Sequence, residues 1–207
     1  MYKQDLLAGR VVVITGVGTG LGRSMALRMA ELGAKMFLCG RREEPLREAC
    51  EAIAKAGGTA AWTQCDVRDP ASVEKMLAAA EQQLGAPDTL VNNAAGNFIA
   101  RTETLSPNAF NAVVSIVLYG TFNCTQALAK RWIAAGQPGT VLNILTTYAE
   151  TGSGFVVPSA CAKAGVLAMT RSLAVEWARY KIRLNAIAPG PFPTEGAWSR
   201  LVPSKDY

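Results

Sequence analysis

Short runs of consecutive apolar residues alternate with longer segments of helical periodicity along most of the chain. The first run, Val11–Thr15, consists of β-branched residues, which is typical of a strand buried on both faces of a parallel sheet. The same alternation recurs up to residue 188. It predicts strands at 11–15, 35–39, 60–65, 89–92, 140–145 and 183–188, and helices at 23–32, 44–55, 70–84, 107–135 and 159–180.

This alternation predicts an α/β fold with a doubly wound, Rossmann-like parallel sheet. The connections are mostly short, and we find no repeat, low-complexity tract or second-domain linker. We therefore expect one dinucleotide-binding and catalytic domain over residues 1–207. Residues 189–207 are rich in proline, glycine and serine, and we expect them to form a loop.

Composition narrows the classes of ligand and of chemistry. The chain is 50% hydrophobic and 18% charged, as globular proteins are, and its formal net charge of +5 suits anionic ligands such as nucleotides. The basic residues form no block, so nucleic acid is not an expected partner. Histidine is absent from the sequence, so acid–base chemistry must use Tyr, Lys, Ser, Thr, carboxylates or a cofactor.

Cysteine usage and hydropathy bear on the compartment. Five cysteines are scattered without a CxxC pair, which favours buried free thiols over disulfides or a metal site. No uninterrupted apolar run approaches the ~20 residues that cross a membrane, and the N-terminus lacks a signal pattern. We expect a soluble, cytoplasmic protein with no bound metal and no membrane association.

A glycine-rich turn joins the first predicted strand to the first predicted helix, which is the context in which such turns bind dinucleotides. Glycines permit a tight turn and a close backbone approach, so that amide N–H groups and the helix N-terminus can hold a pyrophosphate. The spacing differs from GxGxxG, and an ordinary glycine-rich turn is the alternative interpretation. The candidate cofactor-binding residues here are Gly16, Gly18, Thr19, Gly20, Leu21 and Gly22.

Two further positions bear on the choice of cofactor. Arg41 follows the second strand, where an arginine accommodates the 2′-phosphate of NADP(H) and an acidic residue would select NAD. A solvated basic turn is the alternative. Asp66 follows the third strand, where its carboxylate could accept a hydrogen bond from the adenine amino group or could instead cap the next helix.

The stretch 146–163 contains the least expected residues. Lys163 is predicted in about the first turn of a helix, where a cation faces the positive end of the helix dipole at a cost of up to about 1 kcal/mol. An anionic ligand would account for a lysine there. Tyr148 lies fifteen residues upstream, beside a glycine- and serine-rich loop, and the two side chains are candidates for one site. An aromatic side chain packed on the sheet is the alternative for Tyr148.

Together these motifs resemble the short-chain dehydrogenase/reductase family. The resemblance spans residues 11–194 and rests on TGxxxGxG at 15–22, Asp66-Val67, NNAAG at 92–96, Lys163, and Pro189-Gly190 followed by Thr194. Most members carry the catalytic tyrosine four residues before the lysine, but Ser159 stands there in this chain, and Thr146 stands at the usual serine position. The resemblance implies further cofactor contacts from Asn92, Lys163, Pro189, Gly190, Phe192 and Thr194.

Four longer blocks carry a more specific resemblance. NNAAGNF (92–98), LSPNA (105–109), CDVRDP (65–70) and YAETGSGFVVPSA (148–160) resemble the 2,4-dienoyl-CoA reductases of fatty-acid oxidation. The resemblance implies NADPH-dependent reduction of 2,4-dienoyl-CoA thioesters, in which negative charge develops on the thioester oxygen. It implies Tyr148 and Asn97 as hydrogen-bond donors to that oxygen, Lys163 as the ligand of the nicotinamide ribose, and Ser159 as support.

The same resemblance implies acyl-CoA contacts and an assembly. The implied substrate-binding residues are Arg68, Phe98, Ser106 and Arg200. Ser106 precedes Pro107 and could cap a helix, and Phe98 could belong to the core. The helices at 107–135 and 159–180 are expected to pair in a homotetramer.

The chain departs from the family pattern at two points. Tyr119 stands where the family usually has an asparagine that anchors the lysine and an ordered water, which bears on the proton path. The family usually continues past residue 190 through another helix and a final strand. We expect that helix and strand to be missing from this chain, with 188–207 as part of the substrate loop.

Two other functions remain open. One is a carbonyl-acting reductase of the 3-oxoacyl-thioester type that uses Tyr148 from an unusual position. The other is a cofactor-binding pseudoenzyme, which Ser159 and Tyr119 favour. Turnover of 3-oxoacyl rather than dienoyl thioesters would identify the first, and tight NADPH binding without turnover would identify the second.

Overall fold

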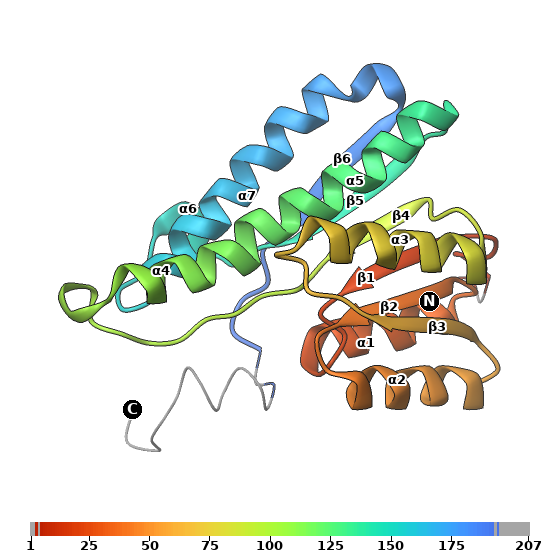
Figure 1. Cartoon of the computed structure of the whole chain (residues 1–207), viewed down its shortest axis with the longest axis horizontal. Helices are drawn as coiled ribbons and strands as arrows, with labels where there is room; N and C mark the ends of the chain where they lie inside the picture. Colours follow the sequence, from red (N-terminus) through yellow and green to blue (C-terminus); the bar gives the residue numbers. More distant parts are fainter. Residues whose placement is uncertain (1–2, 4, 193, 195–207) are drawn as a thin grey trace.

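Six parallel strands form one sheet in the order β3-β2-β1-β4-β5-β6, with helices on both faces (Figure 1). The computed structural model describes residues 3, 5–192 and 194. The strands are β1 Val11–Thr15, β2 Lys35–Gly40, β3 Thr59–Gln64, β4 Thr89–Asn92, β5 Gly139–Ile144 and β6 Ile182–Ile187. The helices are α1 Gly20–Glu31, α2 Glu43–Lys55, α3 Pro70–Leu84, α4 Pro107–Val114, α5 Gly120–Ala135, α6 Tyr148–Thr151 and α7 Val157–Glu176.

The strand order creates the crevice in which a ligand can bind. β1 pairs with β2 on one side and with β4 on the other, so the direction of winding reverses between them. In open α/β sheets, ligands bind outside the carboxyl ends of the strands at such a reversal. The turn after β1 and the segment after β4 therefore lie at the position where a dinucleotide is expected.

Both faces of the sheet are covered, and the two layers divide the apolar residues of each strand. Helices α1 and α2 pack with Val12 and Ile14 on one face, while α3, α5 and α7 pack with Val13 on the other. This explains why β1 is apolar at consecutive positions rather than at alternate ones. The edge strand β6 has the alternating pattern instead, with buried and exposed residues in turn over its first four positions.

The predicted elements are confirmed, with differences at their ends and inside the long helix. α3 matches at both ends, because the Asp69 carboxylate accepts a hydrogen bond from the Ala71 N–H at 2.9 Å and Pro70 begins the helix. The stretch predicted as one helix at 107–135 contains a π-helical turn, Ser115–Tyr119, between α4 and α5. The short helix α6 was not predicted, and α7 ends at Glu176, before the 3-10 turn Ala178–Tyr180.

Hydropathy and cysteine chemistry add two findings. Pro107–Ala135 is long and apolar enough to cross a membrane, but half of its most apolar window is buried in the protein, as in a core helix, so this is weak support for a span. The five cysteines, all within the described residues, are free thiols. The expectation of buried thiols is correct for Cys39, Cys65 and Cys124, whereas Cys50 is half-buried and Cys161 is exposed.

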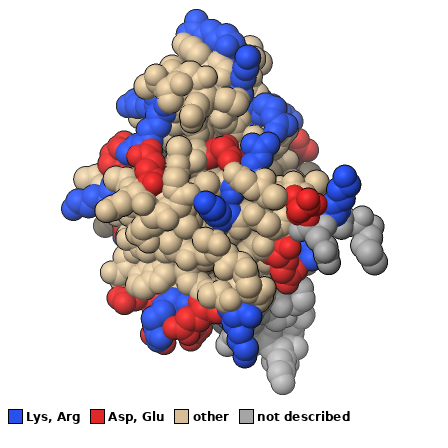
Figure 2. All heavy atoms as spheres, turned by 90° about the vertical axis from the view of Figure 1, so that its right-hand side faces the viewer, with Lys and Arg blue, Asp and Glu red and all other residues tan. Residues whose placement is uncertain are grey.

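Figure 2 shows the charge distribution on the face that lies to the right in Figure 1. Lys and Arg are interspersed with Asp and Glu across this face and do not gather in one patch.

Candidate active site

The turn between β1 and α1 is packed so closely at Gly16 and Gly22 that no side chain larger than hydrogen fits at these two positions. A Cβ atom at Gly16, whose φ is +73°, would lie 2.7 Å from the Ala94 Cα, and one at Gly22 would lie 2.5 Å from both the Asn93 Nδ2 and the Gly16 carbonyl oxygen. The N-cap residue of α1 is Thr19, whose side chain makes no capping hydrogen bond. The first amide groups of α1 are therefore available to an anion such as a pyrophosphate.

Asn93, which sequence reasoning passed over, holds this turn in place. Its Nδ2 donates to the carbonyl oxygens of Thr15 and Gly16, both at 3.0 Å. The backbone N–H groups of Asn93 and Ala94 donate to the Thr15 Oγ1 at 3.0 and 2.9 Å. The segment after β4 is thereby fastened to the glycine-rich turn across the point where the winding reverses.

Asn92, which was predicted to bind the cofactor, directs its side chain into the core instead. Its Nδ2 donates to the Thr125 Oγ1 and to the Asn143 Oδ1, both at 2.9 Å, and the residue is 4% exposed. The Asn143 Nδ2 in turn donates to the Thr170 Oγ1 at 2.8 Å. This buried network links β4 and β5 to α5 and α7, which leaves the main-chain atoms of Asn92 for any contact with a cofactor.

Basic and acidic side chains lie at the ends of β2 and β3. The Arg42 Nη2 lies 3.3 Å from where a Cβ of Gly18 would be, so Arg42, the neighbour of the predicted Arg41, lies beside the glycine-rich turn. The Arg68 Nε donates to both carboxylate oxygens of Asp66, at 2.9 and 3.0 Å. These hydrogen bonds, assisted by the charges of Arg68 and Arg41, lower the pKa of Asp66. The predicted substrate contact Arg68 and the predicted adenine contact Asp66 are thus partners of each other.

Tyr148, Asn97 and Ser159 meet at one hydroxyl group. The Asn97 Nδ2 donates to the Tyr148 hydroxyl at 3.2 Å, and that hydroxyl and the Ser159 Oγ share a hydrogen bond of 3.0 Å. Asn97 is itself oriented, because its Oδ1 accepts from the Phe98 N–H at 2.9 Å. The three side chains come from the segment after β4, from α6 and from α7, so this contact depends on the tertiary structure.

Lys163 lies one helical turn beyond Ser159 on α7, which places the two on the same side of the helix. It is in the second turn of α7 rather than the first, because the helix begins at Val157. The residue is 6% exposed and its Nζ donates to the Ile144 carbonyl oxygen at the end of β5. Burial lowers its pKa to about 8. A buried amine with a lowered pKa, one helical turn from Ser159, is a candidate for contact with a ligand.

Tyr119 ends the π-helical turn and does not take over the role that the family asparagine would have. Its side chain is 58% exposed, and no hydrogen bond of it is found within the described residues. The turn itself packs closely on α7, where a Cβ at Gly165 would lie 3.1 Å from the Leu118 side chain. The chain therefore presents a tyrosine to solvent at this position.

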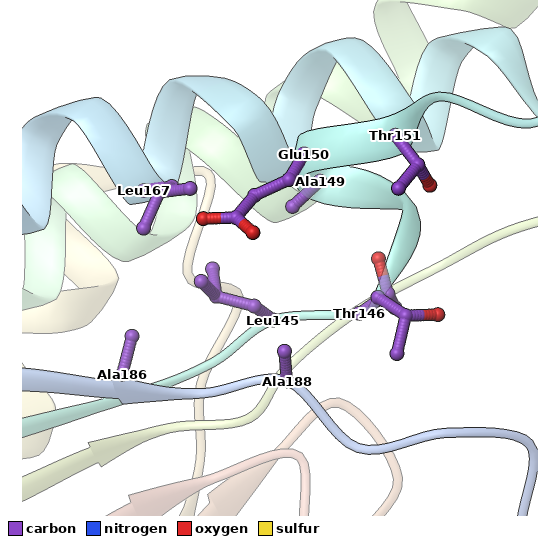
Figure 3. A pocket seen from close by; sticks show the side chains of 9 residues that line it. Leu145, Thr146, Ala149, Glu150, Thr151, Leu167, Ala186 and Ala188 are labelled. Carbon is purple, nitrogen blue, oxygen red and sulfur yellow. The ribbon is translucent and has the colours of Figure 1, made fainter.

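A cavity of about 410 Å³ lies between α6, α7 and the ends of β5 and β6 (Figure 3). The Thr146 Oγ1 is buried without a hydrogen-bond partner within the described residues, and Thr146 is one of the lining residues. Tyr148 is not among its lining residues, although Thr147 and Ala149 on either side of it are. Its lining consists of Leu145, Thr146, Thr147, Ala149, Glu150, Thr151, Leu167, Ala186 and Ala188.

The remaining predicted site residues lie in different surroundings. The Ser106 Oγ accepts from the Ala109 N–H at 3.2 Å, so Ser106 caps α4. Phe98 is half-buried against the cluster around Val113 and Leu145. The Thr194 methyl group lies 3.1 Å from where a Cβ of Gly20 would be, so Thr194 reaches the glycine-rich turn. Phe192 is half-exposed, Pro189 and Gly190 lie in the loop after β6, and Arg200 lies outside the described residues.

The sequence matches a known family and several of its named members. A family model described as short chain dehydrogenase matches residues 10–201. An uncharacterized oxidoreductase from Caenorhabditis elegans is 51% identical over 197 residues, which are 94% of this chain and 63% of that protein. A probable 2,4-dienoyl-CoA reductase from the same organism, named as (3E)-enoyl-CoA-producing, is 47% identical over 203 residues, which are 97% of this chain and 66% of that protein.

A bacterial relative has a different named product. A probable 2,4-dienoyl-CoA reductase from Bacillus subtilis, named as (2E)-enoyl-CoA-producing, is 47% identical over 197 residues, which are 95% of this chain and 78% of that protein. The chain thus spans about two thirds or less of the length of the two Caenorhabditis elegans relatives, and more of the bacterial one.

Solved structures with the same fold include enzymes with different named activities. A short chain dehydrogenase from Bacillus anthracis matches with a TM-score of 0.85 and 49% identity, over 88% of this chain and 74% of that chain. An actinorhodin polyketide ketoreductase with NADPH matches with a TM-score of 0.88 and 33% identity, over 96% of this chain and 76% of that chain.

Proposed function

We propose that this chain, which belongs to the short chain dehydrogenase family, reduces 2,4-dienoyl-CoA thioesters with NADPH. The names of relatives at 47% identity support the reaction class. The observation that carries the proposal is the Tyr148 hydroxyl group, which is bonded to the Asn97 amide at 3.2 Å and to the Ser159 hydroxyl at 3.0 Å.

This group suits a reaction that places negative charge on an oxygen. Bound NADPH would supply a hydride to the far end of the conjugated diene, and the electron pair moves through the diene onto the thioester oxygen. The Tyr148 hydroxyl and the free N–H of the Asn97 amide are neutral donors that can stabilise that charge, which typically accounts for about 10²–10³ in rate per donor. The resulting dienolate is then protonated on carbon by water.

Ser159 and Lys163 would position the reacting partners. Ser159 is 2% exposed and holds the Tyr148 hydroxyl from the α7 side, so it orients a donor without contacting solvent. The buried Lys163 amine, one turn away, can donate to the hydroxyl groups of the nicotinamide ribose. No histidine is needed for any of these steps.

NADPH rather than NADH is proposed because two arginines follow β2. Arg41 and Arg42 are both exposed and can form charge-assisted hydrogen bonds to a 2′-phosphate. Arg41→Asp and Arg42→Asp should each lower the ratio of kcat/KM with NADPH to that with NADH by about 10- to 100-fold, from the loss of one such bond. Arg179→Asp, in the 3-10 turn after α7, is the control for a change of charge alone. An unchanged ratio in both test variants would exclude this assignment.

The reaction is tested by following the nicotinamide absorbance with NADPH and 2,4-decadienoyl-CoA. The wild-type chain should consume both, and Tyr148→Phe should lower kcat by about 10²–10³. Tyr180→Phe removes an equivalent hydroxyl group in the turn beyond α7 and should leave kcat unchanged. Wild-type kcat in Tyr148→Phe would show that the hydroxyl group does not stabilise the charge.

Carbonyl reduction is the second candidate, and the likeness to a ketoreductase structure favours it. A Tyr–Ser pair beside a lysine can also donate to a ketone oxygen. A 3-oxoacyl-CoA in the same assay separates the two, since turnover of that thioester alone would replace the first proposal with this one. NADPH binding without turnover of either thioester would identify a pseudoenzyme.

We also propose that α5 and α7 pair between copies of the chain in a homotetramer. Tyr119 and Phe122 support this, because they leave apolar surface on the helical stretch 107–135 at 58% and 43% exposure. Light scattering on the purified chain measures the assembly, and a monomeric mass would overturn the proposal.

A further inference from the structure

Phe155 has a backbone conformation that bulky residues avoid. Its φ is +62°, and among the described residues other than glycine only Lys181 also has a positive φ. Lys181 follows the 3-10 turn Ala178–Tyr180, and a left-handed residue commonly ends a helix in this way. Phe155 lies in the loop between α6 and α7 and ends no helix, so its conformation requires a different explanation.

The neighbouring glycines show that the loop does not need an aromatic residue there in order to fold. Gly154 has no positive φ, and a Cβ atom added to it would meet nothing within 4 Å. Glycine would fit position 155 without strain, and a side chain could be carried at position 154. The strained position instead carries the largest side chain of the loop, which points to a use for the phenyl ring.

The strained residue is held from both sides by the candidate active site. The Phe155 carbonyl oxygen accepts a hydrogen bond from the Ala100 N–H at 2.9 Å. Ala100 belongs to the segment after β4, three residues beyond Asn97, and Val156 on the other side is buried at the start of α7. The backbone at Phe155 is therefore joined to the same two segments that supply Asn97 and Ser159.

The two segments that this contact joins carry exposed apolar side chains. Phe155 is 58% exposed and Ile99 is 44% exposed, and Phe98 between Asn97 and Ile99 is half-buried. Residues 92–100 and 152–160 include no charged side chain. We refer to Phe98, Ile99 and Phe155 as the apolar rim. Such a surface recognises a hydrocarbon chain and offers nothing to the phosphates of coenzyme A, which require cations.

We propose that Phe155, with Ile99, contacts the acyl chain of the thioester substrate and sets its preferred length. The inference rests on the proposed function, because a thioester oxygen at Tyr148 and Asn97 directs the attached hydrocarbon chain along the two segments that the Ala100–Phe155 hydrogen bond joins. Phe155 combines the left-handed backbone with 58% exposure, and its carbonyl group is bonded to the segment that supplies Asn97.

The test compares kcat/KM for 2,4-decadienoyl-CoA with kcat/KM for 2,4-hexadienoyl-CoA. The wild-type chain should prefer the longer substrate, because each methylene buried against the rim contributes about fourfold. Phe155→Asn should lower this preference by about tenfold or more, equivalent to the loss of about two such methylenes. Phe155→Leu retains an apolar side chain and should keep most of the preference.

If Phe155 only stabilised the fold, Phe155→Asn would lower the unfolding temperature. The proposal predicts no such loss. Asparagine tolerates the left-handed conformation, so Phe155→Asn should unfold at a temperature no lower than that of the wild-type chain. Leu6→Asn removes an exposed apolar side chain at the opposite edge of the sheet, before β1, and should leave the length preference unchanged. A wild-type preference in Phe155→Asn would overturn the inference while leaving the proposed reaction intact.

Failure of the proposed reaction would be seen separately. Calorimetry with NADP⁺ and the unreactive thioesters decanoyl-CoA and hexanoyl-CoA measures chain-length recognition without turnover. If the wild-type chain reduces no dienoyl-CoA but binds decanoyl-CoA more tightly, and Phe155→Asn loses that difference, the acyl contact stands and the reaction does not. Equal affinity for the two thioesters in the wild-type chain would overturn the acyl contact.

Discussion

The glycine-rich turn and the cluster of Tyr148, Asn97 and Ser159, called the Tyr148 group below, both lie near the carboxyl edge of the sheet. They are built from different parts of the chain. The turn consists of backbone from seven consecutive residues. It requires the absence of a side chain at Gly16 and Gly22, since any Cβ there would clash. The Tyr148 group consists of side chains separated by 51 and 11 residues, and its requirement is that three polar atoms meet. Binding a phosphate needs backbone amides in one place, whereas stabilising a developing charge needs donors aimed by distant elements.

The largest expected effect concerns the side-chain group. Asn97→Ala should lower kcat by about 10²–10³, because one of the donors to the thioester oxygen is lost, with little change in the affinity for NADPH. Stopped-flow turnover and fluorescence titration of NADPH measure the two quantities. Asn108→Ala, an exposed position on α4, is the matched control. A loss of NADPH affinity as large as the loss of kcat would show that Asn97 acts in cofactor binding, as the glycine-rich turn does, rather than on the thioester oxygen.

Lys163, which we propose as the ligand of the nicotinamide ribose, should affect the pH dependence of stability. Because burial lowers its pKa to about 8 in the folded chain, the unfolded chain binds more protons there between pH 8 and its ordinary pKa of 10.5. The free energy of unfolding should therefore rise with pH across that window, by on the order of 3 kcal/mol from this residue. In Lys163→Met that rise should be absent, and the protein should be more stable than wild type at pH 7.

Urea titrations at pH values below, within and above the window measure this effect. Other groups titrate in the same range, so the difference between the two proteins is the quantity of interest. Parallel curves for wild type and Lys163→Met would contradict a buried, partly discharged amine.

The glycine-rich turn should be destabilised by an added side chain. Gly22→Ala should lower the free energy of unfolding by about 2 kcal/mol, because its Cβ would overlap the Asn93 amide and the Gly16 carbonyl. It should also weaken NADPH binding. Gly154→Ala, where the added Cβ meets nothing, should change stability by at most about 1 kcal/mol. Denaturant unfolding of both variants tests the difference, and equal effects would mean that the turn relaxes to admit a methyl group.

The smallest effect separates two roles of Ser106. Ser106→Ala should cost about 1 kcal/mol of stability through the loss of the cap on α4. Ser106→Asn should restore most of that stability, because asparagine also caps helices. If the KM for the thioester is unchanged in both variants, capping is the whole role; a KM raised in both would add a substrate contact.

Local signals predicted the elements well and some contacts poorly. Asp69, Pro70 and Gly85 mark both ends of α3, since capping and glycine termination act within a few residues. The π-helical turn was missed because the apolar pattern continues through Ser115–Tyr119 without a break. Helix α6 was missed because four residues carry too little periodicity. Arg42 was passed over for its neighbour because adjacent side chains cannot be told apart before their directions are known.

The sequence alone determined the sheet class, the position of the glycine-rich turn and the presence of arginines after β2, because each depends on periodicity or on backbone within a few residues. Its family resemblance further pointed to Tyr148, Asn97, Ser159 and Lys163. The tertiary structure decided that Asn93 braces the turn while Asn92 faces the core, and that Arg68 pairs with Asp66. It also decided that Phe155 is joined to the segment of Asn97. The contacts of Asn92, Asn93 and Phe155 join residues that are brought together by the crossovers between strands, and adjacent side chains on a strand end point to opposite sides of the sheet. Arg68 and Asp66 are only two residues apart, and their pairing depends on the direction of two side chains in one loop.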